Sequence, residues 1–279
     1  MKKIAVLVDS SADITNEEAK TLGLEVIRMP LTINGEDVME TDGISDKDFI
    51  QKMKDGATVK TSQPLLGNLV FKWKELLETY DGVLFLPISS RLSGTYNSAV
   101  LASKEFDGKV VVVDAKMACC PVQAIAIDAK NMAEKGYSLE EIKNKIENET
   151  YMFACIIPET LTYLKNGGRI SPAAAALGNL LKIIPILKVE DGYIDVSDKV
   201  RTTKKAYMAG IEKTVNVDNP EDYYWFVVHS DCEELAKEYK AVVEEKTHQE
   251  VQIKPIRAII MAHTGPGTLG VCRVKKIKY

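Results

Sequence analysis

The 279-residue chain lacks several features that would assign a functional class directly. Its five cysteines include no C-x-x-C pair, which argues against a zinc site, and their odd number is typical of reduced thiols. A net charge of −4 gives no basic excess for nucleic acid or an anionic membrane. The apolar run Ile4–Val8 is too short for a signal peptide, and Ala173–Leu187 is interrupted by polar residues, glycine and proline. We therefore expect a cytoplasmic protein without stable membrane insertion, without a metal and without a cofactor.

The order of apolar and amphipathic stretches predicts an α/β protein with mostly parallel sheets. In the first half, strands such as Val83–Ile88 alternate with helical stretches such as Pro121–Lys135. The pattern restarts near residue 150, which predicts an N-terminal α/β domain over 1–150 and a C-terminal one over 151–279. In the second half, Asp191-Gly192 predicts a hairpin, and Val251–Ile260 is expected to be extended.

Four segments are unusually rich in hydroxyl-bearing residues and glycine. They are Asp9–Asp13, Thr61–Pro64, Ser89–Thr95 and His263–Thr268. The first and third follow predicted strands and precede predicted helices, where open α/β sheets bind ligands and helix N-termini attract anions. Together they predict a cradle for a carboxylate or a phosphate. The alternative for each segment is a helix cap or a turn, and Asp9 and Asp13 are expected to order the first loop.

The sequence contains neither a Rossmann nor a P-loop glycine fingerprint. A Ser93–His263 pair allows a hydrolase hypothesis, although Arg91-Leu92-Ser93-Gly94 is not a nucleophile elbow. Gly167-Gly168-Arg169 is expected to expose its arginine on a tight loop; the alternative is a surface or interdomain ion pair. The stretch Ala173–Leu187 forms either a core helix and strand or the wall of an apolar pocket.

Six segments, in order along nearly the whole chain, resemble the DegV family. They are Val8–Asp13, Thr61–Pro64, Ile88–Tyr96, Val113–Lys116, Leu164–Ile170 and His263–Gly267. The resemblance implies two α/β domains with the ligand between them. The best-understood members are non-catalytic, fatty-acid-binding subunits of bacterial fatty acid kinase. They hold a long-chain fatty acid in an apolar tunnel and present its carboxylate to a separate ATP-dependent kinase subunit, which forms the acyl phosphate used in phospholipid synthesis.

The resemblance also assigns site residues. Thr61, Ser62, Ser93 and His263 are expected to contact the carboxylate, with a backbone N–H of Gly94 and the hydroxyl of Thr264 as further contacts. Arg169 resembles an arginine that serves productive contact with the kinase subunit. Two departures from the family pattern, Cys119-Cys120 and the absence of a lysine before Pro185, bear on chain-length preference. A Ser/His hydrolase of lipid esters or acyl phosphates and a lipid-sensing regulator remain as alternatives.

Overall fold

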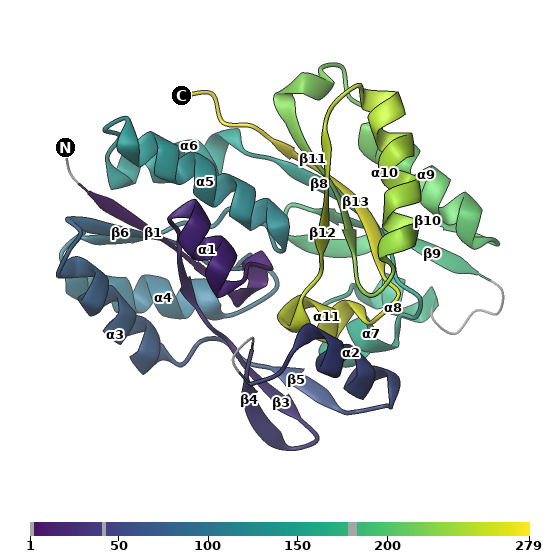
Figure 1. The fold of residues 1–279 in the computed structure, drawn as a ribbon, viewed down its shortest axis with the longest axis horizontal. Coiled ribbons are helices and arrows are strands. Elements are labelled where there is room, and N and C mark those ends of the chain that lie inside the picture. Colours follow the sequence, from purple (N-terminus) through teal and green to yellow (C-terminus); the bar gives the residue numbers. More distant parts are fainter. Residues whose placement is uncertain (1–2, 41–42, 178–182) are drawn as a thin grey trace. The chain divides into compact units, whose positions relative to one another are not determined.

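The structure is a computed structural model that describes residues 3–40, 43–177 and 183–279. It divides into two compact units (Figure 1). The first comprises Met1–Ser45, Val59–Thr150 and Lys276–Tyr279, and the second comprises Asp46–Thr58 and Tyr151–Lys275. This division differs from a single boundary at residue 150, because 46–58 groups with the second unit and 276–279 with the first.

A parallel four-stranded sheet forms the centre of the first unit. Its strands are β1 (Ile4–Asp9), β2 (Glu25–Ile27), β6 (Gly82–Leu86) and β7 (Val110–Val112), in the order β2-β1-β6-β7. The chain passes from β1 to β2 on one side and later returns with β6 on the other side of β1. The strand order therefore reverses between β1 and β6, and open α/β sheets bind ligands at the carboxyl ends of strands beside such a switch point.

Helices cover both faces of this sheet. Helices α3 (Leu66–Leu77) and α4 (Thr95–Ser103) pack on one face, where Trp73 is fully buried with its ring edge-on to Phe85 and Phe106. Helices α5 (Cys120–Glu134) and α6 (Leu139–Glu149) contact β1 and β7 from the other face. Helices α1 (Asn16–Leu22) and α6 begin at capping boxes in which Thr15 and Ser138 are the N-caps.

A small antiparallel sheet, β4-β3-β5, completes the first unit. It contains β3 (Pro30–Ile33), β4 (Glu36–Met39) and β5 (Val59–Thr61). Asn34 and Gly35 form the turn between β3 and β4: both residues have positive φ, 52° and 90°, as a two-residue hairpin loop requires. Between β4 and β5 the chain forms α2 (Asp46–Lys54), which groups with the second unit.

The second unit contains a six-stranded mixed sheet in the order β10-β9-β8-β13-β11-β12. The strands are β8 (Met152–Ile157), β9 (Ile184–Glu190), β10 (Tyr193–Val200), β11 (Tyr223–His229), β12 (Val251–Pro255) and β13 (Leu269–Lys275). Among the described strands of this sheet, only β11 and β12 pair in parallel, so the expectation of mostly parallel sheets is wrong for this unit. The hairpin predicted at Asp191-Gly192 joins β9 and β10, and β13 runs antiparallel between β8 and β11.

The two faces of this sheet are covered differently. Helices α9 (Thr203–Val215) and α10 (Glu233–Thr247) bury one face in the main core, around Trp225 and Tyr207. Helices α7 (Thr162–Gly167) and α8 (Pro172–Leu177) cover part of the other face through a smaller cluster that includes Leu164 and Leu187.

The segment Val251–Ile260 is not extended throughout, as the sequence suggested. Strand β12 ends at Pro255, and α11 (Ala258–Thr264) follows. A short apolar run can be a buried strand or a buried helix, and its periodicity does not separate the two. Here Ala258–Ala262 is buried on every side, so no amphipathic signature marks the helix. His263 consequently lies in the last turn of a helix and not in a loop.

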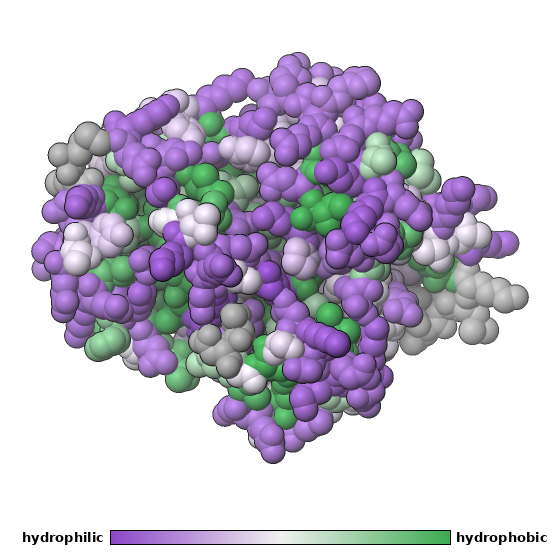
Figure 2. Space-filling view, in the orientation of Figure 1, coloured by the Kyte–Doolittle hydropathy of each residue, from purple (hydrophilic) through white to green (hydrophobic). Residues whose placement is uncertain are grey.

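No helix in the described part of the chain is both long enough and apolar enough to cross a bilayer. Figure 2 shows hydrophilic residues over most of the visible face, with hydrophobic residues in separate small groups.

Candidate functional site

The carboxyl ends of β1 and β6 are joined by one buried carboxylate. Asp9, the last residue of β1, accepts hydrogen bonds from the Ser11 N–H at 3.0 Å and from the Ser11 hydroxyl, and its other oxygen accepts from the Ile88 N–H at 3.0 Å. Burial raises the pKa of the Asp9 carboxyl, and these hydrogen bonds act in the opposite direction. Asp9 thus orders the first loop, as expected from the sequence, and it also fixes the loop that carries Ser93.

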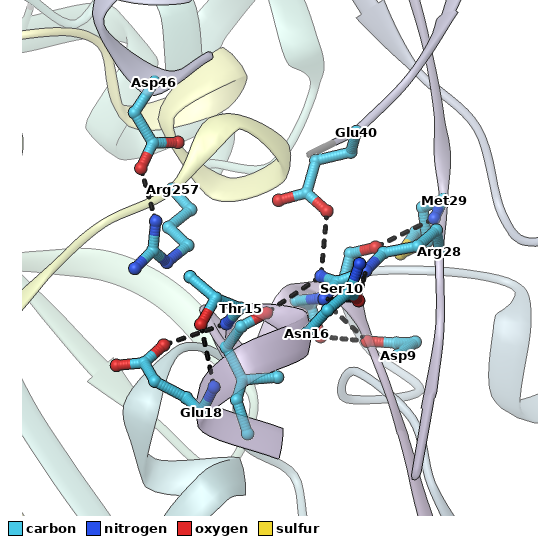
Figure 3. A network of polar contacts seen from close by, with 12 residues as sticks. Asp9, Ser10, Thr15, Asn16, Glu18, Arg28, Met29, Glu40, Asp46 and Arg257 are labelled. Carbon is cyan, nitrogen blue, oxygen red and sulfur yellow. Dashed lines mark hydrogen bonds and ion pairs between the residues drawn. The ribbon is translucent and has the colours of Figure 1, made fainter. Parts of the chain in front are cut away.

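A second polar network joins the loop after β1 to residues 28–40 (Figure 3). The Ser10 hydroxyl accepts from the Met29 N–H at 2.8 Å. The guanidinium of Arg28 donates to the Ile14 carbonyl at 2.8 Å and pairs with the buried carboxylate of Glu40 at 3.1 Å. The hydroxyls of Ser10 and Ser11 in the loop after β1 therefore both have hydrogen-bond partners within the first unit.

The loop after β6 leads into the candidate head-group segment. Ser93 places its hydroxyl 2.9 Å from the Thr95 hydroxyl and accepts from the Thr95 N–H at 3.3 Å. Gly94 is the N-cap of α4 and has no side chain to cap the helix. The α4 N-terminus therefore presents backbone N–H groups and the Ser93 hydroxyl, a combination suited to an anion.

The Thr61–Pro64 segment lies beside this N-terminus. Thr61 ends β5 opposite Leu31, and the Ser62 N–H donates to the Pro30 carbonyl at 3.1 Å. The next residue, Gln63, accepts from the Ser98 hydroxyl of α4 at 3.2 Å, and its side-chain oxygen lies 3.5 Å from the position of a Cβ on Gly94. The first unit therefore brings four predicted site residues onto neighbouring segments, with Ser62 exposed.

In the second unit, His263 on α11 packs against a glycine on α7. A Cβ on Gly167 would lie 2.2 Å from the Nδ1 atom of His263, far inside contact distance. The reverse arrangement occurs one turn away, where a Cβ on Gly265 would lie 2.3 Å from the Tyr163 ring. The His263 ring thus lies over Gly167 of α7, and the Tyr163 ring of α7 lies over Gly265, the C-cap of α11.

The local environment keeps His263 neutral. Burial, together with the smaller effect of the nearby positive charge of Arg169, lowers the pKa of its imidazole from 6.5 to about 4. A neutral imidazole has one N–H donor. Since an effective general base has a pKa near the working pH, His263 suits hydrogen bonding better than proton abstraction.

Arg169 is half-buried, so the expectation of an exposed side chain is wrong. Gly168 caps α7 with φ 68°, and this left-handed turn directs Arg169 back, where its guanidinium donates to the Gly167 carbonyl. Thr264 is also buried, and its hydroxyl donates to the Ile260 carbonyl at 3.3 Å. The second unit therefore brings Arg169 and His263 together, whereas the Thr264 hydroxyl already serves its own helix.

The apolar stretch Ala173–Leu187 is described in part. Ala174 and Leu187 are fully buried in the smaller cluster under α7 and α8, which favours the core interpretation for these two residues. Residues 178–182 lie outside the described part of the chain. Of the two departures from the family pattern, Cys119 has an unusual backbone, with φ 64° and ψ −160° at the start of α5.

The structural roles of two residues in the predicted segments were not identified from the sequence. Gln63 links two site segments, and Gly167 makes room for the imidazole. The glycine pair before Arg169 was visible in the sequence, but its partner ring was not, since Gly167 and His263 are 96 residues apart in the numbering.

Comparison with known proteins identifies the family. The family model described as "Uncharacterised protein, DegV family" matches residues 3–276. A protein of Thermotoga maritima named "Fatty acid-binding protein" is 37% identical over 295 residues, covering 96% of both chains. A DegV domain-containing protein of Clostridium acetobutylicum is 33% identical over 278 residues, again covering 96% of both. The solved structure of DegV, a fatty-acid-binding protein from Bacillus subtilis, superposes with a TM-score of 0.87 at 31% identity, covering 99% of this chain and 100% of the other. This chain therefore belongs to the DegV family.

Proposed function

We propose that this protein binds a long-chain fatty acid and is not itself a catalyst. The observation that carries the proposal is the α4 N-terminus, where the N-cap residue Gly94 has no side chain and the neighbouring Ser93 hydroxyl accepts from the Thr95 N–H. Such a group of donors suits a carboxylate, and two of the relatives above are named as fatty-acid-binding proteins. Burial of methylene groups favours binding by about 0.8 kcal/mol each, so a long acyl chain contributes strongly before ordering costs.

We propose that six residues contact the carboxylate: Thr61, Ser62, Ser93, Gly94, His263 and Thr264. A desolvated carboxylate needs several donors to offset the loss of water. Neutral His263 supplies an N–H without carrying a charge of its own, and its low pKa makes it a poor base for a Ser/His hydrolase. Thr264 is the weakest of the six, because its hydroxyl already donates within α11.

The binding proposal is tested by organic extraction of the natively purified protein followed by mass spectrometry. We expect a co-purified acyl chain, or uptake of added oleate or palmitate by the delipidated protein. Ser93→Ala and His263→Ala should each weaken binding, whereas Ser103→Ala, on the same helix as the Ser93 segment but at its far end, should not. Lack of both co-purified and added fatty acid would overturn the proposal, and covalent labelling of Ser93 by a fluorophosphonate would favour the hydrolase instead.

We further propose that a separate ATP-dependent kinase subunit phosphorylates the bound carboxylate and that Arg169 serves that partner. The rigid, permanently charged guanidinium suits a phosphoryl group on which negative charge accumulates. Its hydrogen bond to the Gly167 carbonyl holds it beside His263. Arg169→Ala should reduce acyl-phosphate formation with the kinase more than it reduces fatty-acid affinity. Equal losses in both measurements, together with a lower melting temperature, would assign Arg169 a structural role.

A further inference from the structure

A pocket of about 420 Å³ lies in the second unit, apart from the residues proposed to bind fatty acid. Its walls come from the beginnings of α2 and α10, the ends of β11 and β12, and α11. The apolar part of the lining consists of Ile50, Leu235, Pro255, Ile256 and Met261. Pockets that bind small molecules have volumes from about 300 Å³ upward, so this one is large enough for a short organic ligand.

The charged part of the lining is entirely acidic. It consists of Asp46, Asp231, Glu233 and Glu234, and the residues that line the pocket within the described chain include no lysine or arginine. Two of these carboxylates form ion pairs with cations that do not line the pocket. Asp46 pairs with Arg257 (Figure 3), and Asp231 pairs with Lys54.

The ion pairs around the pocket leave an excess of negative charge. Lys237 is shared between Glu233, at 3.3 Å, and Glu234, at 2.7 Å, so three cations face four carboxylates. The α10 N-terminus adds a partial positive charge of about half a unit. A further carboxylate, Glu159, lies near enough to raise the pKa values of both Lys54 and Cys232. Its negative charge outweighs the partial positive charge of the helix N-terminus, so the surroundings of the pocket remain negative.

A buried imidazole adds a second, independent feature. His229 ends β11, lines the pocket and is 8% exposed, and its Nδ1 atom has no hydrogen-bond partner in the described residues. Buried polar atoms without partners are rare in native proteins and call for a ligand or another explanation. Burial lowers the pKa of His229, so the ring is neutral and has a nitrogen lone pair that can accept a hydrogen bond.

We propose that this pocket binds a small organic monocation, an alkylammonium or an alkylguanidinium. The apolar lining accommodates the alkyl chain, the carboxylates attract the cationic head, and the unpartnered imidazole offers a hydrogen-bonding site for an N–H of the head group. A metal ion is a poorer match, because no group of three or more His, Cys, Asp or Glu side chains in the described ranges is arranged to hold one. The pocket lining includes none of the six residues proposed to contact the fatty-acid carboxylate.

Methionine methyl NMR of the whole chain provides the test. Met261 lines the pocket, and Met132 on α5, in the other unit, serves as the reference. n-Butylammonium and n-butylguanidinium should shift the Met261 methyl signal saturably and leave Met132 unchanged, whereas 1-butanol, the neutral analogue, should have no saturable effect. Equal binding of 1-butanol would overturn the proposal, because it would mean a merely apolar groove.

Two variants and a matched control complete the experiment. Asp231→Asn preserves a side chain that tolerates its left-handed backbone, φ 56°, and Glu234→Gln removes an exposed carboxylate from the pocket edge. Asp231→Asn should weaken cation binding about tenfold, as expected for a hydrogen bond to a charged group. Glu234→Gln should weaken it less, about two- to fivefold, because its carboxylate is exposed to solvent. Glu245→Gln, on the same helix but not in the lining, should leave the affinity unchanged. No saturable shift of Met261 with either cation, or equal affinity in all three variants, would refute the assignment.

Discussion

Replacing Gly167 with alanine tests whether the contact between α7 and α11 sets the properties of His263. Gly167 has a helical backbone, so alanine is compatible with its conformation. The added methyl would, however, lie 2.2 Å from Nδ1 and 3.1 Å from Cε1 of the ring. The ring must retreat by more than about 1 Å, and such overpacking typically costs about 1–3 kcal/mol.

Displacement of the ring changes its titration. The pKa of His263 is about 4 chiefly because of burial. A ring pushed toward water should recover a pKa closer to 6.5, and fatty-acid binding should weaken because the N–H donor has moved. The chain has only three histidines, so their Hε1 proton signals can be assigned from His229 and His248 variants and followed through a pH titration.

Gly168→Ala is the matched control. Gly168 has φ 68°, and no heavy atom lies within 4 Å of the position its Cβ would take. Alanine there should cost about 1–2 kcal/mol through backbone strain alone, similar in size to the Gly167 effect but without contact with the ring. An unchanged His263 titration in Gly167→Ala, or the same change in both variants, would refute the reasoning.

Three further predictions follow from the buried polar groups. Asp9→Asn should lower the free energy of unfolding, measured by urea denaturation, by about 1–2 kcal/mol, because an amide cannot accept all the hydrogen bonds of this carboxylate. The control Asp107→Asn, at an exposed position, should change the free energy of unfolding little. Arg169→Ala should raise the pKa of His263 in an NMR titration, whereas Arg169→Lys, which keeps the charge, should not. The unfolded chain binds a proton at His263 more readily than the native chain does. The free energy of unfolding should therefore fall by up to about 3 kcal/mol as the pH drops from 6.5 to 4. Urea denaturation across that pH range should show a smaller fall for His263→Gln.

Local signals in the sequence determined much of the secondary structure. The hairpins at Asn34-Gly35 and Asp191-Gly192 follow from residues that adopt positive φ readily. The parallel sheet of the first unit follows from the alternation of short apolar runs with amphipathic helices, and the position of Ser93 after a buried strand already predicted a ligand-binding loop.

Tertiary structure decided the features that depend on residues far apart in the chain. Helix α11 forms where the sequence suggested an extended segment, because a fully buried apolar run has no periodicity that separates helix from strand. Helix α2 groups with the second unit, where it contacts α11 and Asp46 pairs with Arg257, and no local pattern reveals these long-range contacts. The low pKa of His263 and the partial burial of Arg169 likewise depend on the packing of α7 against α11, since only the folded chain brings Gly167 of α7 under the His263 ring.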